Sequence, residues 1–245
     1  MSNEVIRQLR ERKSMRVYTD QPIPAECKAE IIQAALEAPT AGNMCLYSIL
    51  DITDQAIKDT LAVTCDDQPF IARAPLTLIF VADYRRWYLS YRLVCGSDVR
   101  KPAEGDLMLA ACDALIAAQN TVVAAESLGI GSCYIGDILE NYERHKALLN
   151  LPQYTMPVAM LCYGYPVEQQ KKRAKPARYR AEHIVSENGY RPADEARLRE
   201  MHDLVYGQGA FESMVKRTYE RKWNKPFIEE MTRSVRRWMD DWTSG

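Results

Sequence analysis

The stretch GDLMLAACDALIAAQNTVVAAESLGIGSCYIGD, residues 105–137, decides the fold of this chain. From Leu107 to Leu128 nearly every residue is apolar or small, which predicts a long helix covered by protein on most of its circumference. Asp113 and other polar residues interrupt the run, and each charge at a bilayer centre would cost roughly 2.5–3.5 kcal/mol. We therefore expect an interior helix rather than a membrane span. Gly129 and Gly131 predict its end, because glycine commonly follows the last helical residue.

The composition is that of a globular intracellular protein. The chain has 245 residues, 47% of them hydrophobic, which suffices for one full core with an appendage. A net charge of -1 provides no general attraction to nucleic acid or membrane. The seven cysteines form no C-x-x-C pair, and the polar N-terminus does not resemble a secretory signal. These features predict a cytoplasmic protein with reduced cysteines.

Apolar periodicity and turn residues place the other elements around the central helix and predict an α+β domain, with a sheet packed under that helix. We expect the core domain to span residues 1–190, followed by a helical extension, residues 191–245, that docks on the domain or on a partner subunit. The expected strands are Tyr47–Ile52, Ala74–Ala82 and Met156–Tyr163. The expected helices, besides the central one, are Glu4–Arg12, Pro24–Leu36, Gln55–Val63, Leu139–Leu149, Ala193–Val205, Phe211–Arg221 and Lys225–Trp242.

Two basic clusters are the first candidates for a binding site. One is Arg12-Lys13-Ser14-Met15-Arg16, and the other runs from Lys171 to Arg180. Either cluster alone is more often a solvated face, but together they would form a site for a dianionic phosphate, since arginine offers bidentate hydrogen bonds. The glycines after the central helix have the wrong spacing and context for a dinucleotide-binding loop. Cys133 among them is better explained as a small core residue than as a nucleophile. No histidine has a partner at metal-ligand spacing, so we expect no metal site.

Five motifs in a fixed order make the chain resemble the FMN-dependent nitroreductase family between about Glu4 and Tyr190. The resemblance implies a nitroreductase-like sandwich, in which a mostly antiparallel sheet surrounds the long buried helix. It also implies an intertwined homodimer with FMN sites at the subunit interface. The motifs are Arg12-Lys13-Ser14-Met15-Arg16, Ala38-Pro39-Thr40-Ala41-Gly42-Asn43, Ala118-Gln119-Asn120 through Gly131 to Tyr134-Ile135-Gly136-Asp137, Gly164-Tyr165-Pro166, and Lys175-Pro176-Ala177-Arg178.

The resemblance implies roles for residues at both ends of the flavin. Arg12 and Ser14, with the neighbouring Lys13, match positions that hold the FMN phosphate and ribityl chain, and Lys175 or Arg178 would join them. The motif is often Lys-x-Arg in the family, and the inserted residue here leaves open which of the two cations meets the phosphate.

The remaining matched positions surround the flavin ring. Arg16 matches a cation at the pyrimidine edge, where a fixed positive charge raises the reduction potential. Gln68 resembles an amide that bonds the pyrimidine. The loop that reaches the flavin from the partner subunit matches Pro39, Thr40, Ala41 and Asn43, and the segment behind the ring matches Tyr134, Ile135 and Gly136. Where family members often carry glutamine, this chain has Cys45, which cannot supply the paired donor and acceptor of an amide.

The activity implied is ping-pong hydride transfer from NADPH or NADH, through FMN, to nitroaromatics, quinones or similar small acceptors. No protein side chain is assigned a catalytic role, because the cofactor carries the chemistry. Two alternatives remain: a specialised flavin enzyme of the same fold (dehalogenation, flavin fragmentation or a biosynthetic oxidation), or a flavin-binding interaction protein without turnover. The sequence leaves open the nucleotide preference, the physiological acceptor and the role of the helical tail.

Overall fold

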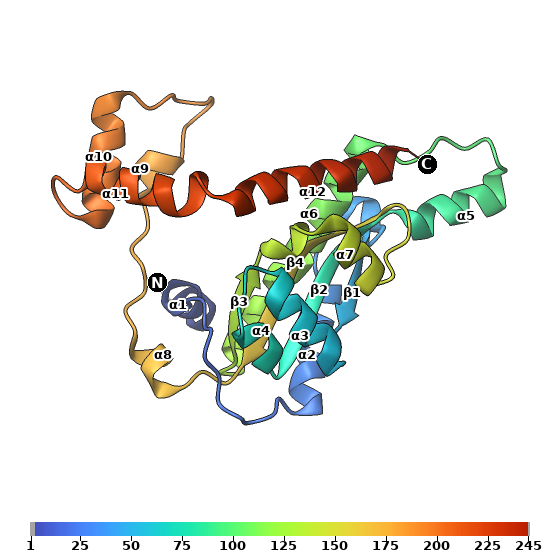
Figure 1. Cartoon of the computed structure of the whole chain (residues 1–245), viewed down its shortest axis with the longest axis horizontal. Helices are drawn as coiled ribbons and strands as arrows, with labels where there is room; N and C mark the ends of the chain where they lie inside the picture. The colour runs from blue at the N-terminus through green and yellow to red at the C-terminus, as the bar shows by residue number, and fades with distance from the viewer. Residues whose placement is uncertain (1–2, 245) are drawn as a thin grey trace. The chain divides into compact units, whose positions relative to one another are not determined.

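The structure, a computed structural model, describes residues 3–244 and divides them into two compact units, which are treated separately (Figure 1). The first unit runs to Arg173 and resumes at Glu230, and the second is Ala174–Glu229. The first unit contains α1 (Glu4–Glu11), α2 (Ala25–Leu36), η1 (Ala41–Asn43), β1 (Tyr47–Asp51), α3 (Gln55–Thr64), α4 (Phe70–Arg73), β2 (Leu76–Asp83), α5 (Arg85–Cys95), α6 (Glu104–Ser127), β3 (Gly131–Ile135), η2 (Asp137–Leu139), α7 (Tyr142–Leu148), β4 (Thr155–Gly164) and α8 (Glu168–Lys172). The second contains α9 (Ala181–Ile184), α10 (Glu195–Tyr206), α11 (Phe211–Thr218), a π-helical turn η3 (Tyr219–Trp223) and the start of α12 (Pro226–Thr243).

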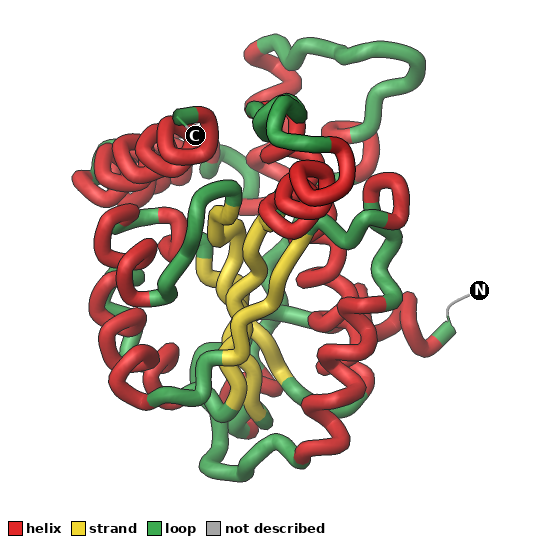
Figure 2. Tube along the Cα trace, turned by 90° about the vertical axis from the view of Figure 1, so that its right-hand side faces the viewer, coloured by secondary structure: helices red, strands yellow, loops and turns green. Residues whose placement is uncertain are grey.

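The sheet of the first unit is antiparallel throughout, with strand order β1-β2-β4-β3. Figure 2 shows the strands between helices on both sides. Side chains alternate along β2 and β4, so each strand supplies both faces. Leu78, Phe80, Leu161 and Tyr163 pack with α2 and α6. The residues next to them, Ile79, Val81, Met160 and Cys162, pack in a second core with α3, α4 and α7. The expected α+β sandwich is confirmed.

The central helix ends as the glycines predict. Gly129 adopts a φ of +72°, the left-handed region that disfavours other residues. The amide of Ile130 donates to the carbonyl of Ala125 at 2.9 Å, and that of Gly129 to the carbonyl of Glu126 at 3.1 Å. This is the hydrogen-bond pattern of a Schellman motif, which satisfies the last helical carbonyls and turns the chain into β3.

One stripe of α6 is exposed. One face of the helix is fully buried against the sheet and α2, through Ala114, Ala117, Ala118 and Val122. A row at helical spacing on the same helix is exposed: Met108 (63% exposed), Leu109 (50%), Leu115 (44%) and Ile116 (41%). The expectation that the helix is covered on most of its circumference is therefore not met within this chain. Length and composition would also suit α6 to a membrane, but core helices pass the same test, and its buried residues form the centre of this unit.

The expected helices and strands are present with ends shifted by a few residues, and the structure adds several elements, among them β3 and α5. The sequence did not predict β3, because Gly131, Ser132 and Cys133 suggest a turn rather than a strand; pairing with β4 overrides that local preference. The segment after β2, ambiguous from its sequence, forms α5 and ends at Gly96, whose φ is +96°.

The end of α12 belongs to the core of the first unit. Trp238 and Trp242 are each 1% exposed. The indole N–H of Trp238 donates to the carbonyl of Leu139, and that of Trp242 to the carbonyl of Ala103, both at 3.2 Å. The ring of Tyr142 meets that of Trp238 edge-on, with centroids 4.6 Å apart. The last helix is therefore a structural part of the domain that holds the sheet.

Candidate active site

The N-terminal segment after α1 is held against the sheet by backbone hydrogen bonds. The amide of Met15 donates to the carbonyl of Ser132 in β3 at 2.9 Å, and the amide of Thr19 to the carbonyl of Tyr165 at 2.8 Å. Tyr18 also forms an isolated antiparallel bridge with Pro166. The basic cluster, residues 12–16, is thus placed directly beside the strand that follows the central helix.

Two glycines make this close approach possible. A Cβ on Gly131 would lie 2.6 Å from Cγ of Met15, and one on Gly164 would lie 2.6 Å from Cγ of Tyr18. Real Cβ atoms do not come this close to other atoms, so any larger residue would push the segment away from the sheet. Two of the glycines within the family-like motifs are explained by this contact.

The cations of the cluster converge on β3. The charges of Arg16 and Arg12 and a hydrogen bond from Ser14 act to lower the pKa of the Cys133 thiol, but burial is the larger effect and the pKa is raised. Cys133 therefore remains a thiol, in agreement with the core role predicted for it. Arg12 also acts on Tyr134, whose pKa burial raises to about 12. The Nε of Arg12 is buried and has no hydrogen-bond partner in the described part of the chain.

The late basic region reaches the same segment. Lys13 Nζ donates to the carbonyl of Lys171, and Arg173 Nη2 donates to the carbonyl of Ser14, each at 2.6 Å. From the sequence, the two basic clusters would form a phosphate site only if the fold brought them together, and residues 171–173 do meet the first cluster. Arg173 was not singled out from the sequence; its position in the same basic run was the available signal.

Lys175 and Arg178, the two cations assigned to the phosphate by resemblance, belong to the second unit. Arg178 Nη1 donates to the carbonyl of Pro176 at 3.1 Å, a contact within its own loop. Their approach to Arg12 and Ser14 stays a prediction.

Gln68 lies beside the segment that follows β3. Its Nε2 donates to the carbonyl of Cys65 and to Oδ2 of Asp137, both at 2.8 Å. Ile135 is 2% exposed and its side chain fills the core, so only its backbone is available to a ligand. Gly136 is exposed, and nothing lies within 4 Å of the place where its Cβ would be. The structure thus holds Gln68 at Asp137, the residue that follows Gly136 in the chain.

The loop of Pro39, Thr40, Ala41 and Asn43 is anchored to α6 and α5 rather than to the N-terminal segment, as far as the described residues show. Asp113 of α6, only 3% exposed, accepts the amide of Ala41 at 2.9 Å and that of Leu46 at 3.1 Å. Trp87 Nε1 donates to the carbonyl of Met44 at 2.7 Å. Asn43 and Cys45 stay exposed, with φ of +58° and +50°. The loop tip therefore points away from its own core.

Comparison with known proteins identifies the family of this chain. The model of the nitroreductase family matches residues 9–165, which include the N-terminal cluster, the central helix and β3. The chain belongs to the nitroreductase family. It is 32% identical over 228 residues to an oxygen-insensitive NADPH nitroreductase of Salmonella typhimurium, covering 89% of this chain and 91% of that protein. It is also 32% identical over 219 residues to an FMN reductase [NAD(P)H] of Bacillus subtilis, covering 88% and 85%.

Solved structures of related proteins share the fold of this nitroreductase-family member. Nitroreductase A from Vibrio parahaemolyticus superposes with a TM-score of 0.80 at 28% identity, covering 98% of both chains. The NADPH:FMN oxidoreductase from Vibrio harveyi, solved in complex with NAD+, superposes with a TM-score of 0.75 at 29% identity, covering 94% of this chain and 98% of that one. The similarity extends over both units of the chain.

The residues of the site suit FMN. A phosphate dianion needs several charged or polar donors, and the segment offers Arg12, with its buried and unpartnered Nε, together with Lys13 and Ser14. A flat ring needs backbone without side chains in its way, which the open space at Gly136 provides. At the polar edge of the ring, Arg16 would supply a cation. Gln68 would offer its Oε1 as an acceptor, because its Nε2 already donates to Cys65 and Asp137.

Proposed function

We propose that this protein is an FMN-dependent oxidoreductase that passes hydride from NADPH or NADH to nitroaromatic, quinone or similar small acceptors by a ping-pong mechanism. The observation that carries the proposal is the attachment of the basic segment, residues 12–16, to β3 through the Met15–Ser132 hydrogen bond, together with the contact of Arg173 with Ser14. The names of the two curated relatives support the same donor and cofactor. We place the protein in the cytoplasm on the basis of its composition.

Bound FMN supplies the redox chemistry, and the chain supplies the binding site. Arg12, Lys13 and Ser14 hold the phosphate and ribityl chain, and Lys175 or Arg178 completes the phosphate site. Arg16 places a permanent positive charge at the pyrimidine edge, since an arginine guanidinium does not lose its proton in proteins. Gln68 bonds the same edge, and the backbone from Tyr134 to Gly136 lines the back of the ring. No side chain has to carry a proton in this scheme.

The active form is proposed to be a homodimer with the sites at its interface. The exposed apolar stripe of α6, which includes Met108, Leu109 and Ile116, is larger than isolated surface residues would explain. The exposed loop tip at Asn43 and Cys45, whose flanking residues Asp113 holds, supports this proposal because it points away from its own core. Sedimentation equilibrium should give a mass of twice the 28.0 kDa of one chain. Leu109→Glu places a charge in the apolar stripe and should shift the measured mass toward that of the monomer. A wild-type monomer that binds FMN fully would contradict the dimeric site.

The first experiment is the visible spectrum of the purified protein, before and after anaerobic addition of NADPH or NADH. A flavin spectrum that bleaches with either nucleotide, and FMN released on denaturation, is the expected result. Parallel lines in double-reciprocal plots with a nitroaromatic acceptor would support the ping-pong order. A colourless protein that fails to take up FMN would overturn the proposal.

Matched variants test the site itself. Arg12→Gln should raise the dissociation constant for FMN at least tenfold, because a charge-assisted hydrogen bond contributes about 1.5–3 kcal/mol. Arg144→Gln, an exposed arginine on α7, is the control and should leave FMN binding unchanged. Turnover of only a narrow range of acceptors would favour a specialised flavin enzyme, and FMN binding without NAD(P)H oxidation would favour a binding protein.

A further inference from the structure

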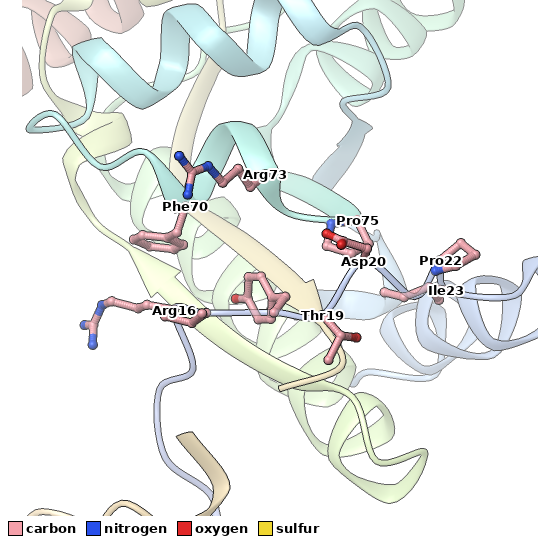
Figure 3. A pocket seen from close by; sticks show the side chains of 10 residues that line it. Arg16, Thr19, Asp20, Pro22, Ile23, Phe70, Arg73 and Pro75 are labelled. Atoms are coloured by element: carbon pink, nitrogen blue, oxygen red, sulfur yellow. The ribbon is translucent and has the colours of Figure 1, made fainter. Parts of the chain in front are cut away.

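A separate pocket lies next to Arg16, between the N-terminal segment and the turn from α4 to β2. Its volume is about 560 Å³, within the range of small-molecule sites. In the view of Figure 3, Arg16, Phe70 and Arg73 lie toward one end of the pocket, and Asp20 and Pro75 lie toward the other. All of its lining residues belong to the first unit.

The chemistry of this pocket favours a planar anion. Neither Arg16 nor Arg73 has a hydrogen bond or ion pair to another residue within 3–244. Since Arg16 is shared with the proposed flavin site, the guanidinium group of Arg73 is the one left for a ligand of this pocket. Figure 3 shows the aromatic ring of Phe70 between the side chains of the two arginines. Arginine binds carboxylates with two parallel hydrogen bonds, and aromatic ligands pack on rings such as Phe70. Asp20 would repel an anion from the opposite end and so orient it.

The pocket adjoins the proposed flavin site without being that site. Arg16 belongs to both, because its charge also acts on Cys133 of β3. The groups assigned to the phosphate, ribityl chain and ring, among them Arg12, Ser14, Gln68 and Tyr134, do not line it. A molecule held at Arg73 would therefore lie in the same pocket as Arg16, the residue proposed to meet the pyrimidine edge of the flavin.

We propose that this pocket binds the carboxylate end of an aromatic electron acceptor, with Arg73 as the residue that selects it. The inference rests on the proposed function and narrows its acceptor class to anionic aromatics. In the first two-electron step, NADPH and a proton reduce a nitro group to a nitroso group and water. The carboxylate takes no part in this step and serves for recognition alone.

The test compares two acceptors that differ in charge, 4-nitrobenzoate and the neutral 4-nitrobenzyl alcohol. Arg73→Gln should lower kcat/KM for 4-nitrobenzoate by about tenfold or more, chiefly through KM, because one charge-assisted contact is lost. It should leave kcat/KM for the alcohol and the FMN affinity unchanged. Asp20→Asn should raise kcat/KM for 4-nitrobenzoate and leave that for the alcohol unchanged. The control Arg144→Gln should change kcat/KM for neither acceptor. Equal effects of Arg73→Gln on both acceptors, or no effect on either, would overturn the proposal.

Calorimetric titration of 4-nitrobenzoate into the purified protein, without NAD(P)H, separates this proposal from the proposed function. Binding that weakens in Arg73→Gln, in a protein that does not oxidise NAD(P)H, would reject the function and retain the pocket. Turnover of the alcohol without any Arg73-dependent binding of 4-nitrobenzoate would retain the function and reject the pocket. Displacement of bound 4-nitrobenzoate by added FMN would show that the pocket is part of the flavin site and would also reject the proposal.

Discussion

Oδ2 of Asp113, in the middle of the central helix, accepts the backbone amide of Leu46 at 3.1 Å, and its Oδ1 accepts that of Ala41 at 2.9 Å. One buried carboxylate thus holds both ends of this loop. By the family resemblance, the loop contacts the flavin across the subunit interface. A carboxylate suits this task because both of its oxygens accept hydrogen bonds. Local sequence patterns did not indicate this role, since Asp113 stood out only as a charge within an apolar run.

Asp113→Asn should loosen the loop. An amide has one accepting oxygen, so its NH2 group would face a backbone N–H, and a buried N–H left without a partner costs about 1–3 kcal/mol. If the loop reaches the flavin as proposed, the dissociation constant for FMN should rise severalfold. Fluorescence titration of FMN and urea denaturation would measure the two effects.

Asp106→Asn is the matched control for this variant, because Asp106 is a buried aspartate of the same helix. It accepts the amide of Ala103 and pairs with Arg100, and so caps the start of α6 rather than holding the loop. Its loss should reduce stability and leave FMN affinity unchanged. A fall in FMN affinity of the same size in both variants would show that Asp113 acts only through general stability.

Gly131→Ala should displace the basic segment from the sheet. The new Cβ would lie 2.6 Å from Cγ and 2.9 Å from Cβ of Met15, and the latter atom cannot swing aside without moving the backbone. We expect FMN binding to weaken by tenfold or more. Gly105→Ala is the control. A Cβ at this position meets open space, and in the helix α6 alanine is favoured over glycine by roughly 0.5–1 kcal/mol. This variant should therefore bind FMN with unchanged affinity.

Trp238→Ala should cost about 3–5 kcal/mol of unfolding free energy, the usual range for a large aromatic side chain removed from a core. The ring is 1% exposed, packs on Tyr142 and donates to Leu139. Trp223→Ala removes the same side chain from a site that is 72% exposed. Chemical denaturation should therefore separate the two variants by several kcal/mol, and similar costs would show that Trp223 is covered in the assembled protein.

The attachment of α12 should weaken in acid. Glu230 accepts hydrogen bonds from Arg233, from Ser234 and from the amide of Asn141. These contacts, that of Arg233 first, lower its pKa from 4.5 to about 2. Because the folded-state pKa lies below the unfolded one, this contribution is complete above about pH 4.5 and is lost as the pH falls toward 2.

Thermal melts between pH 7 and pH 2 would check this. Glu230→Gln should lower Tm at pH 7 and flatten its decline below pH 4.5. Part of the slope should remain, because Glu143, which also pairs with Arg233, has its pKa lowered to about 2 in the same way. An unchanged slope in the variant would show that Glu230 does not titrate with folding.

Local signals were sufficient wherever one segment decides its own structure. The apolar run of α6, the glycines that end it, and the alternation or continuity of apolar residues in β1, β2 and β4 predicted these elements to within a few residues. The order of the five motifs was enough to identify the family, since motif content and spacing are properties of the chain itself. The two basic clusters could be recognised in the sequence, but their meeting, through Arg173 and Ser14, was decided by the fold.

Only the tertiary structure decided the features that depend on two distant segments. Gly131 forms a strand because β4 pairs with it, and it must be glycine because Met15 crosses above it. Asp113 holds a loop that lies about seventy positions earlier in the chain. Arg73 lines a pocket with Arg16 because α4 packs near the N-terminal segment. Composition and periodicity record what a residue does within its own element, whereas hydrogen bonds and close approaches between elements arise only when the sheet brings them together.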